Sequence, residues 1–151
     1  MNDTETNKGR ILVIDDDKTV LTVFRAGLRQ EGFEVDVAST GKEAVEKSEA
    51  KVYNVALIDI RLPDMQGTQL LTDLKETMPR MRKIIVTGYP DLQNAIASVQ
   101  KGADYFITKP TKIDELVKVV REQLRKQQEE KQYGEKRVAQ YVETRLRETP
   151  L

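Results

Sequence analysis

The sequence contains neither cysteine nor histidine, and each absence removes a class of chemistry. Without cysteine there are no disulfides, thiolate metal ligands or cysteine nucleophiles. Without histidine, Ser-His and Cys-His catalysis are excluded, and no imidazole can ligate a metal or carry a phosphoryl group. Any metal must therefore be held by oxygen, which favours Mg²⁺, Mn²⁺ or Ca²⁺ over Zn²⁺ or Cu²⁺.

The chain also lacks long apolar runs and an excess of charge. No apolar run exceeds four residues, and residues 1–10 contain no hydrophobic signal core, so no membrane span or secretion signal is predicted. Lys+Arg and Asp+Glu both number 25, and this balance favours neither nucleic acid nor an anionic membrane as a partner. We expect a cytoplasmic protein whose 151 residues form one domain with a real core.

Strand-like and helix-like patterns alternate five times along the chain. Short apolar segments bounded by turn signals indicate buried strands at residues 11–14, 55–58, 84–86 and 105–108, and an alternating segment indicates a half-exposed strand at 34–38. Segments with apolar residues at helical spacing follow each of them. Five such units predict a doubly wound α/β domain over residues 9–126, with a parallel sheet and helices on both faces, after a polar tail of residues 1–8.

The remaining residues, 127–151, differ in character and contain no recognisable output domain. Residues 127–137 are charged and rich in glutamine, and Gly134 interrupts them. A narrow apolar stripe follows, formed by Val138, Tyr141, Val142 and Leu146. We interpret the segment as a charged helical extension or linker. The pattern leaves open whether it extends the last helix, forms a short dimerising helix or frays.

Polar side chains follow the ends of four predicted strands. Asp15 and Asp16 follow the first, Asp59 the third, Thr87 the fourth and Lys109 the fifth. Ligands of open parallel sheets bind at the carboxyl ends of the strands, so we expect these groups to converge. Two carboxylates 4–5 Å apart repel by roughly 3–4 kcal/mol at an effective dielectric constant of 20, which a cation would offset. An ammonium group suits a phosphate, so the set predicts one divalent cation and one phosphoryl group.

Four segments together resemble the receiver domain of two-component response regulators, the CheY-like family. They are ILVIDDD at 11–17, LIDIRLPDMQG at 57–67, IVTGY at 85–89 and GADYFITKP at 102–110. The resemblance covers residues 9 to about 126 and implies a flavodoxin-like (βα)₅ fold with strand order 2-1-3-4-5. It also implies a signalling switch phosphorylated by a sensor histidine kinase or a phosphotransfer protein.

The resemblance implies a role for each site residue. Asp59 would be the phosphoacceptor. Mg²⁺, with Mn²⁺ as an alternative, would be bound by Asp16, Asp59 and the backbone carbonyl of Arg61, while Asp15 would act through water. The protein would be no enzyme toward other substrates, although it would assist its own phosphorylation and dephosphorylation.

The same resemblance implies a conformational switch. Lys109 would neutralise the phosphoryl oxygens, Thr87 would turn to hydrogen-bond them, and Phe106 would be the aromatic side chain that turns inward. Phe106 lacks the hydroxyl of the tyrosine that is frequent at this position. The partner face is expected on the fourth and fifth predicted helices, at Gln93, Gln100, Lys112 and Lys118.

Two large side chains, Arg61 and Tyr89, each lie two residues after a site residue. We hypothesise that they crowd the water that would hydrolyse the acyl phosphate. An aspartyl-phosphate phosphatase is the enzymatic alternative, but such enzymes typically place a second acid where this chain has Arg61. A flavin module is disfavoured because the acids of residues 15–17 would repel a phosphate. A stand-alone receiver, a phosphorylation-dependent homodimer and a fragment of a longer regulator all remain open.

Overall fold

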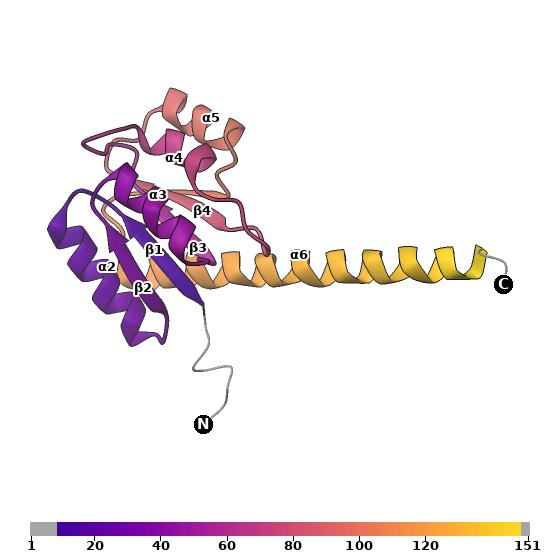
Figure 1. Ribbon diagram of the computed structural model, residues 1–151. Coiled ribbons are helices and arrows are strands. Elements are labelled where there is room, and N and C mark those ends of the chain that lie inside the picture. The colour runs from indigo at the N-terminus through magenta and orange to yellow at the C-terminus, as the bar shows by residue number, and fades with distance from the viewer. Residues whose placement is uncertain (1–8, 149–151) are drawn as a thin grey trace.

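Five strands and five helices make up the computed structural model, which describes residues 9–148 (Figure 1). The strands are β1 (Arg10–Ile14), β2 (Glu34–Ala38), β3 (Val55–Ile58), β4 (Arg82–Thr87) and β5 (Tyr105–Thr108). The helices are α2 (Lys18–Gln30), α3 (Gly41–Ala50), α4 (Gly67–Asp73), α5 (Leu92–Gln100) and α6 (Ile113–Glu148).

The strands form one parallel sheet in the order β2-β1-β3-β4-β5. Alternate residues of the central strands point to opposite faces, so two apolar cores form. On one face, Ile11 and Val13 pack with buried residues of α2 and α6, such as Leu28 and Val120. On the other face, Leu12 packs with residues of α3 and α4. The prediction of a doubly wound, flavodoxin-like fold with this strand order is therefore confirmed.

Two strands differ from their sequence-based prediction. The fifth strand was predicted as buried, but β5 lies at the sheet edge and is half-exposed, with 48% of Tyr105 accessible. Its aromatic residues resemble a core segment, and only the strand order reveals that one side has no neighbour. β4 begins at Arg82, before the apolar run that indicated it, because the Arg82 side chain finds polar partners and is buried.

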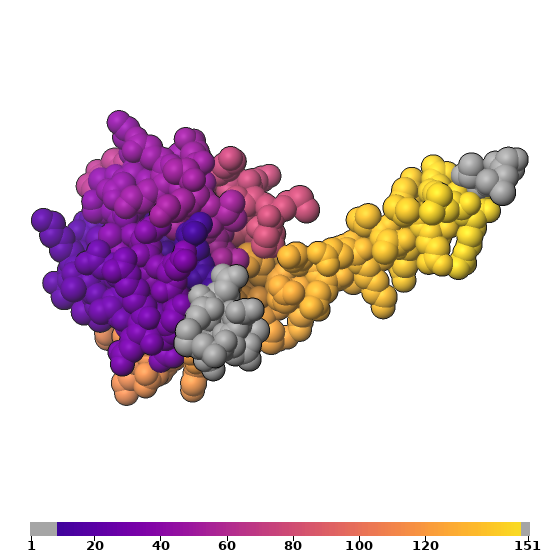
Figure 2. Space-filling model, turned by 60° about the horizontal axis from the view of Figure 1, so that its bottom comes forward, coloured from indigo at the N-terminus to yellow at the C-terminus, as the bar shows by residue number. Residues whose placement is uncertain are grey.

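The last helix, α6, packs on the sheet over its first half only. Its buried residues are Leu116, Val117, Val120, Gln123 and Gln127. Residues 128–148 are all exposed, and this part of the helix projects away from the body of the molecule (Figure 2). Within residues 9–148, no helix has both the length and the apolar composition needed to cross a membrane.

Candidate functional site

The backbone places the predicted site residues at one edge of the sheet. The parallel hydrogen-bond ladder continues one residue past the strands: the amide of Asp15 donates to Ala38 O, and that of Asp59 donates to Ile14 O, both at 3.0 Å. The amide of Lys109 likewise donates to the Thr87 carbonyl at 2.8 Å. These residues therefore start from rigid strand ends rather than from free loops.

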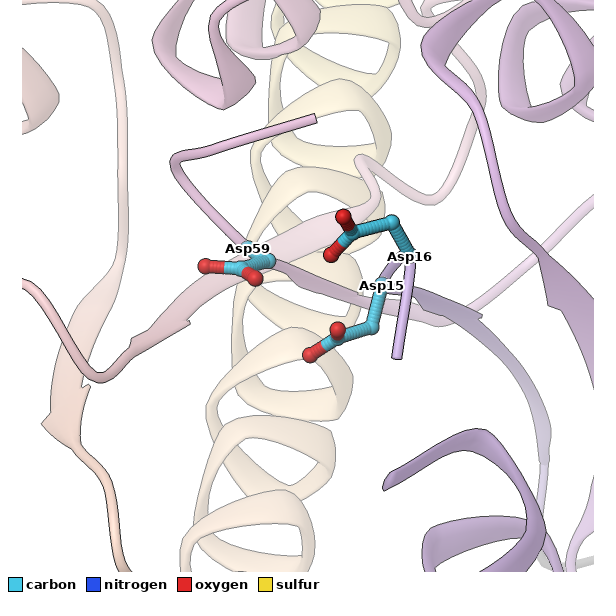
Figure 3. Close-up of side chains that lie close together, drawn as sticks. All are labelled: Asp15, Asp16 and Asp59. Atoms are coloured by element: carbon cyan, nitrogen blue, oxygen red, sulfur yellow. The ribbon is translucent and has the colours of Figure 1, made fainter. Parts of the chain in front are cut away.

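Three carboxylates converge above this edge (Figure 3). Asp15, Asp16 and Asp59 each offer an oxygen, and these oxygens all lie within 4.8 Å of one another. Asp15 and Asp59 are buried, whereas Asp16 is exposed. The Oδ1 atom of Asp59 is buried without a hydrogen-bond partner among the described residues. Buried polar atoms are nearly always satisfied, so this oxygen marks a place where a ligand is expected.

The ammonium of Lys109 lies against two of the three carboxylates. Its Nζ atom is 2.5 Å from Asp15 Oδ2 and 3.4 Å from Asp59 Oδ2. Burial alone would lower the pKa of Lys109, but the hydrogen bond to Asp15 and the charges of Asp15 and Asp59 outweigh it and raise that pKa. Lys109 therefore stays protonated and leaves the cluster with an excess of negative charge.

The pKa of Asp15 is also raised, but for Asp15 the largest cause is burial. Burial raises its pKa above the ordinary value of 3.8, although hydrogen bonds from Lys109 and from the Asp17 amide act against this shift. Asp15 Oδ1 accepts that amide at 2.9 Å, while Asp17 itself caps α2 by accepting from Thr19 N. Burial thus outweighs these two hydrogen bonds and makes the Asp15 carboxylate more ready to gain a proton than an exposed aspartate.

Thr87 and Phe106 lie on the neighbouring strands β4 and β5. The Thr87 side chain is completely buried, and its hydroxyl oxygen accepts from the Tyr89 amide at 3.1 Å. Phe106 is partly buried and packs against the core on the α3–α4 face of the sheet. Both strands end beside the three aspartates. A structural change at these aspartates would therefore reach Thr87 and Phe106 over a short distance.

Arg61 and Tyr89 contact each other from the two loops that follow Asp59 and Thr87. The Arg61 guanidinium carbon lies 3.8 Å from the centroid of the Tyr89 ring, close enough for a cation–π contact. Both side chains remain exposed to solvent. The β3–α4 and β4–α5 loops are thereby bridged by side chains whose spacing in the sequence is 28 residues.

The β3–α4 loop and the first residue of α4 contribute two further residues that hold the site and that the sequence alone did not reveal. The amide of Gly67 donates to Ile60 O at 2.6 Å, and a Cβ atom there would lie 1.9 Å from the Asp59 carbonyl oxygen. The Asp64 carboxylate accepts from the amides of Gly41 and Lys42 at 2.8 and 2.9 Å. These hydrogen bonds lower the pKa of Asp64 and fasten the loop to the N-terminus of α3.

The donor set fits a hard divalent cation. All groups that face the centre of the cluster, apart from Lys109, are carboxylate oxygens, which Mg²⁺, Mn²⁺ and Ca²⁺ prefer. Two of the carboxylates are buried, and one of their oxygens lacks a partner in the described part of the chain. Asp15, Asp16 and Asp59 are thus the residues that could hold such an ion.

Comparison with known families gives a match over most of the chain. The family model described as response regulator receiver domain matches residues 11–121. The transcriptional regulator NtrC of Escherichia coli K12 is 34% identical over 125 residues, which cover 83% of this chain and 27% of NtrC. The chain thus spans about a quarter of the length of the curated relatives it matches.

Solved structures give the same fold. A CheY-like receiver domain protein from Methanospirillum hungatei JF-1 is 43% identical, with a TM-score of 0.77 over 80% of this chain and 97% of the other. A response regulator protein from Burkholderia pseudomallei, solved with a phosphorylated aspartic acid, a calcium ion and citrate, is 28% identical. Its TM-score is 0.66 over 72% of this chain and 64% of that one.

Proposed function

Because this chain belongs to the response regulator receiver domain family, we propose that it is a phosphorylation-activated switch with Asp59 as phosphoacceptor. The observation that carries this proposal is the buried Oδ1 of Asp59, which has no hydrogen-bond partner within residues 9–148 and lies beside two further carboxylates and the Lys109 ammonium. A carboxylate oxygen attacks the phosphorus of a phosphohistidine, a P–O bond forms, the P–N bond breaks, and the departing imidazole takes up a proton.

Mg²⁺, or Mn²⁺ in its place, would be held by Asp16, Asp59 and the backbone carbonyl of Arg61, with Asp15 acting through water. When bound, the ion would supply charge neutralisation for the incoming phosphoryl oxygens. Lys109 would supply a second positive charge beside Asp59. The Asp64 and Gly67 contacts would keep the β3–α4 loop, and with it the Arg61 carbonyl, close to Asp59.

Thr87 and Phe106 would carry the change away from the site. An added phosphoryl group brings about −1.5 to −2 charge and three acceptor oxygens. Thr87 would give up its bond from the Tyr89 amide and donate its proton to a phosphoryl oxygen, leaving space into which Phe106 turns. The face of α5, β5 and α6 that would then change exposes Ile96, Val99 and Tyr105, and we propose it as the partner surface, together with the polar residues at positions 93, 100, 112 and 118.

The immediate phosphodonor would be a sensor histidine kinase or a phosphotransfer protein, whose histidine would replace the one that this chain lacks. A groove of about 360 Å³ between α2 and the β5–α6 loop, lined by Val20, Val23 and Pro110, also includes Lys109, and we propose that it receives a helix of that partner. Residues 127–151 would serve as a helical extension. Output would lie with a protein partner or with domains of a longer regulator.

Incubation with acetyl phosphate and Mg²⁺, followed by intact mass measurement, tests the proposal. We expect a gain of one phosphoryl group that is lost in Asp59→Asn but retained in Asp114→Asn, an exposed control on α6. Equal labelling of Asp59→Asn would refute the assignment of the phosphoacceptor. Sustained release of phosphate from small phosphate esters would instead favour the aspartyl-phosphate phosphatase.

A further inference from the structure

The β3–α4 loop, residues 59–66, carries the backbone carbonyl that the proposed function assigns to the divalent cation. This carbonyl belongs to Arg61. A backbone carbonyl has no side-chain torsions with which to adjust to an ion, so it binds only where the chain holds it. Its usefulness to the cation therefore depends on the contacts that fix the loop, and these lie at the ends of the loop and at its tip.

The two ends of the loop are joined to each other. The amide of Gly67 donates to Ile60 O at 2.6 Å. Arg61 and Gln66 form an isolated antiparallel bridge just inside this hydrogen bond. These local contacts close the loop on itself, but they do not determine where its tip lies relative to the rest of the domain.

The tip of the loop is attached to the N-terminus of α3. Asp64 Oδ1 accepts from the Gly41 amide at 2.8 Å, and Oδ2 accepts from the Lys42 amide at 2.9 Å, across 23 and 22 residues of sequence. The next amide of the helix, that of Glu43, donates to the Thr40 hydroxyl at 3.1 Å. The free amides and the dipole of a helix N-terminus favour a carboxylate. A local cap and a distant carboxylate thus share this terminus.

The residue after Asp64 packs at the same place. A Cβ atom on Gly41 would lie 2.4 Å from Met65 Sδ and 2.5 Å from Met65 Cγ. The missing side chain at Gly41 therefore lets Met65 lie against the start of α3, where Met65 also packs against the core on the α3–α4 face of the sheet. Two successive residues of the loop tip thus contact α3, one through hydrogen bonds and one through packing.

We propose that Asp64 is a positioning residue for the divalent cation, because its attachment to α3 fixes the loop that presents the Arg61 carbonyl, and that this rigidity favours Mg²⁺ over Ca²⁺. The inference rests on the proposed function, which places the cation at Asp16, Asp59 and Arg61. Asp64 is exposed and is not one of the three clustered carboxylates, so it acts through the loop. Mg²⁺ requires near-ideal octahedral geometry, whereas Ca²⁺ accepts longer and less regular contacts, so a fixed carbonyl benefits Mg²⁺ more.

Calorimetric titration of the full chain with MgCl₂, without any phosphodonor, tests the positioning role. Asp64→Ala should raise the dissociation constant for Mg²⁺ by about tenfold, as expected when the support of a metal ligand is lost. Thr40→Ala is the matched control, because it removes the local cap of the same helix and leaves the loop attached. It should lower the urea midpoint but change Mg²⁺ affinity by less than about twofold. Equal weakening by the two variants would overturn the proposal.

Asp64→Asn separates position from charge. This variant loses the same negative charge as Asp64→Ala, but its remaining side-chain oxygen can still accept a hydrogen bond from the start of α3. Its affinity for Mg²⁺ should therefore lie between those of the unaltered protein and Asp64→Ala. Equal losses in the two variants would assign the effect to the charge of Asp64 and would contradict a positioning role.

The same titrations with CaCl₂ test the selectivity. Asp64→Ala should weaken Ca²⁺ binding by less than about threefold, so the preference for Mg²⁺ should fall. Equal losses for the two ions would refute this part of the proposal. If the unaltered protein bound no Mg²⁺, or if Asp59→Asn bound it equally well, the cation site of the proposed function would be refuted together with the inference. Unchanged Mg²⁺ binding by Asp64→Ala, with binding lost in Asp59→Asn, would overturn the inference alone.

Discussion

Both ends of the sheet contain a cluster of charged and polar side chains, but the two clusters differ in how fully their polar atoms are hydrogen-bonded. At the carboxyl end, Asp15, Asp16 and Asp59 share one ammonium, and one buried oxygen has no partner in the described part of the chain. At the other end, Arg82 donates to Gln123 at 2.9 Å and to Glu130 at 2.6 Å.

The network at this second end joins three parts of the fold. Arg80 pairs with Asp104 at 2.8 Å, and Gln127 donates to the carbonyl oxygens of Arg80 and Asn54. Asn54 returns a hydrogen bond to Gln127 at 3.0 Å. In this network Arg80 and Arg82 balance the charges of Asp104 and Glu130, and the side-chain amides of Gln123 and Gln127 are hydrogen-bonded. A polar cluster whose members all have hydrogen-bond partners stabilises the fold. A buried polar cluster that lacks partners is instead suited to bind a ligand.

The largest effect that separates the two ends is expected for Arg82→Ala. Removing this guanidinium leaves the buried Gln123 oxygen without its donor and takes from Glu130 its closest cation, so the free energy of unfolding should fall by about 2–4 kcal/mol. Urea denaturation measures this change, and labelling by acetyl phosphate in the folded protein should change less than about twofold. Arg121→Ala removes an exposed ion pair and should cost less than about 1 kcal/mol. Equal losses would contradict the contrast between the two ends.

Lys109→Ala should instead affect the rate of phosphorylation more than the free energy of unfolding. Without the ammonium, the phosphoryl oxygens lose a fixed positive charge, and the rate of phosphorylation should fall by about a hundredfold. Lys112→Ala, three residues later and exposed, provides the matched control. Rates are measured by intact mass against time at saturating Mg²⁺. A rate within threefold of the unaltered protein would remove Lys109 from the phosphoryl site.

A smaller effect is expected for the contact between Arg61 and Tyr89. The Arg61 guanidinium and the Tyr89 ring contact each other on the loops that follow Asp59 and Thr87, and we expect them to hinder the approach of water to an acyl phosphate. In an Arg61→Asn, Tyr89→Ala double variant the phosphoryl half-life should shorten by about tenfold, by analogy with other water-excluding closures. The half-life is followed by mass after removal of the donor. An unchanged or longer half-life would disprove the hypothesis.

The smallest effect concerns pH. Because burial raises the pKa of Asp15, protons compete for this carboxylate at a higher pH than for an aspartate of ordinary pKa 3.8. As the pH falls from neutral, Mg²⁺ affinity should therefore begin to decrease before ordinary aspartates titrate. Asp15→Asn should bind Mg²⁺ more weakly but with a flatter pH profile. Calorimetric titration at several pH values measures both, and parallel profiles would exclude Asp15 as the titrating group.

The features that could be predicted from the sequence are those that repeat locally. Strand ends are visible as short apolar runs, and the residue after each run, such as Asp59 or Lys109, must lie at the same edge once the strands are parallel. Caps are local too: Thr40 accepts from Glu43 N and Asp91 from Asn94 N, so each cap bonds a residue only three positions away.

The features that could not be predicted depend on contacts across the fold. Arg82 is tolerated in a buried strand because it donates a hydrogen bond to Gln123, 41 residues later. No local sequence pattern predicts that partner. Asp64 holds the N-terminus of α3 across 23 residues, so its role emerges only from the folded loop. The half-exposed β5 was missed because strand order, rather than composition, decides which strand lies at an edge.

The unbroken course of α6 has a mechanical consequence. The helix is anchored to the ends of β3 and β4 through Asn54, Arg82 and Gln127, and beyond this anchor it runs freely to Glu148. It is therefore a lever whose fulcrum is the polar network. A tilt of 10° at the fulcrum would sweep the tip by about 5 Å for an arm of about 27 Å. Displacements within the domain too small to alter its outline would be magnified at the far end into a change of position that another molecule could read.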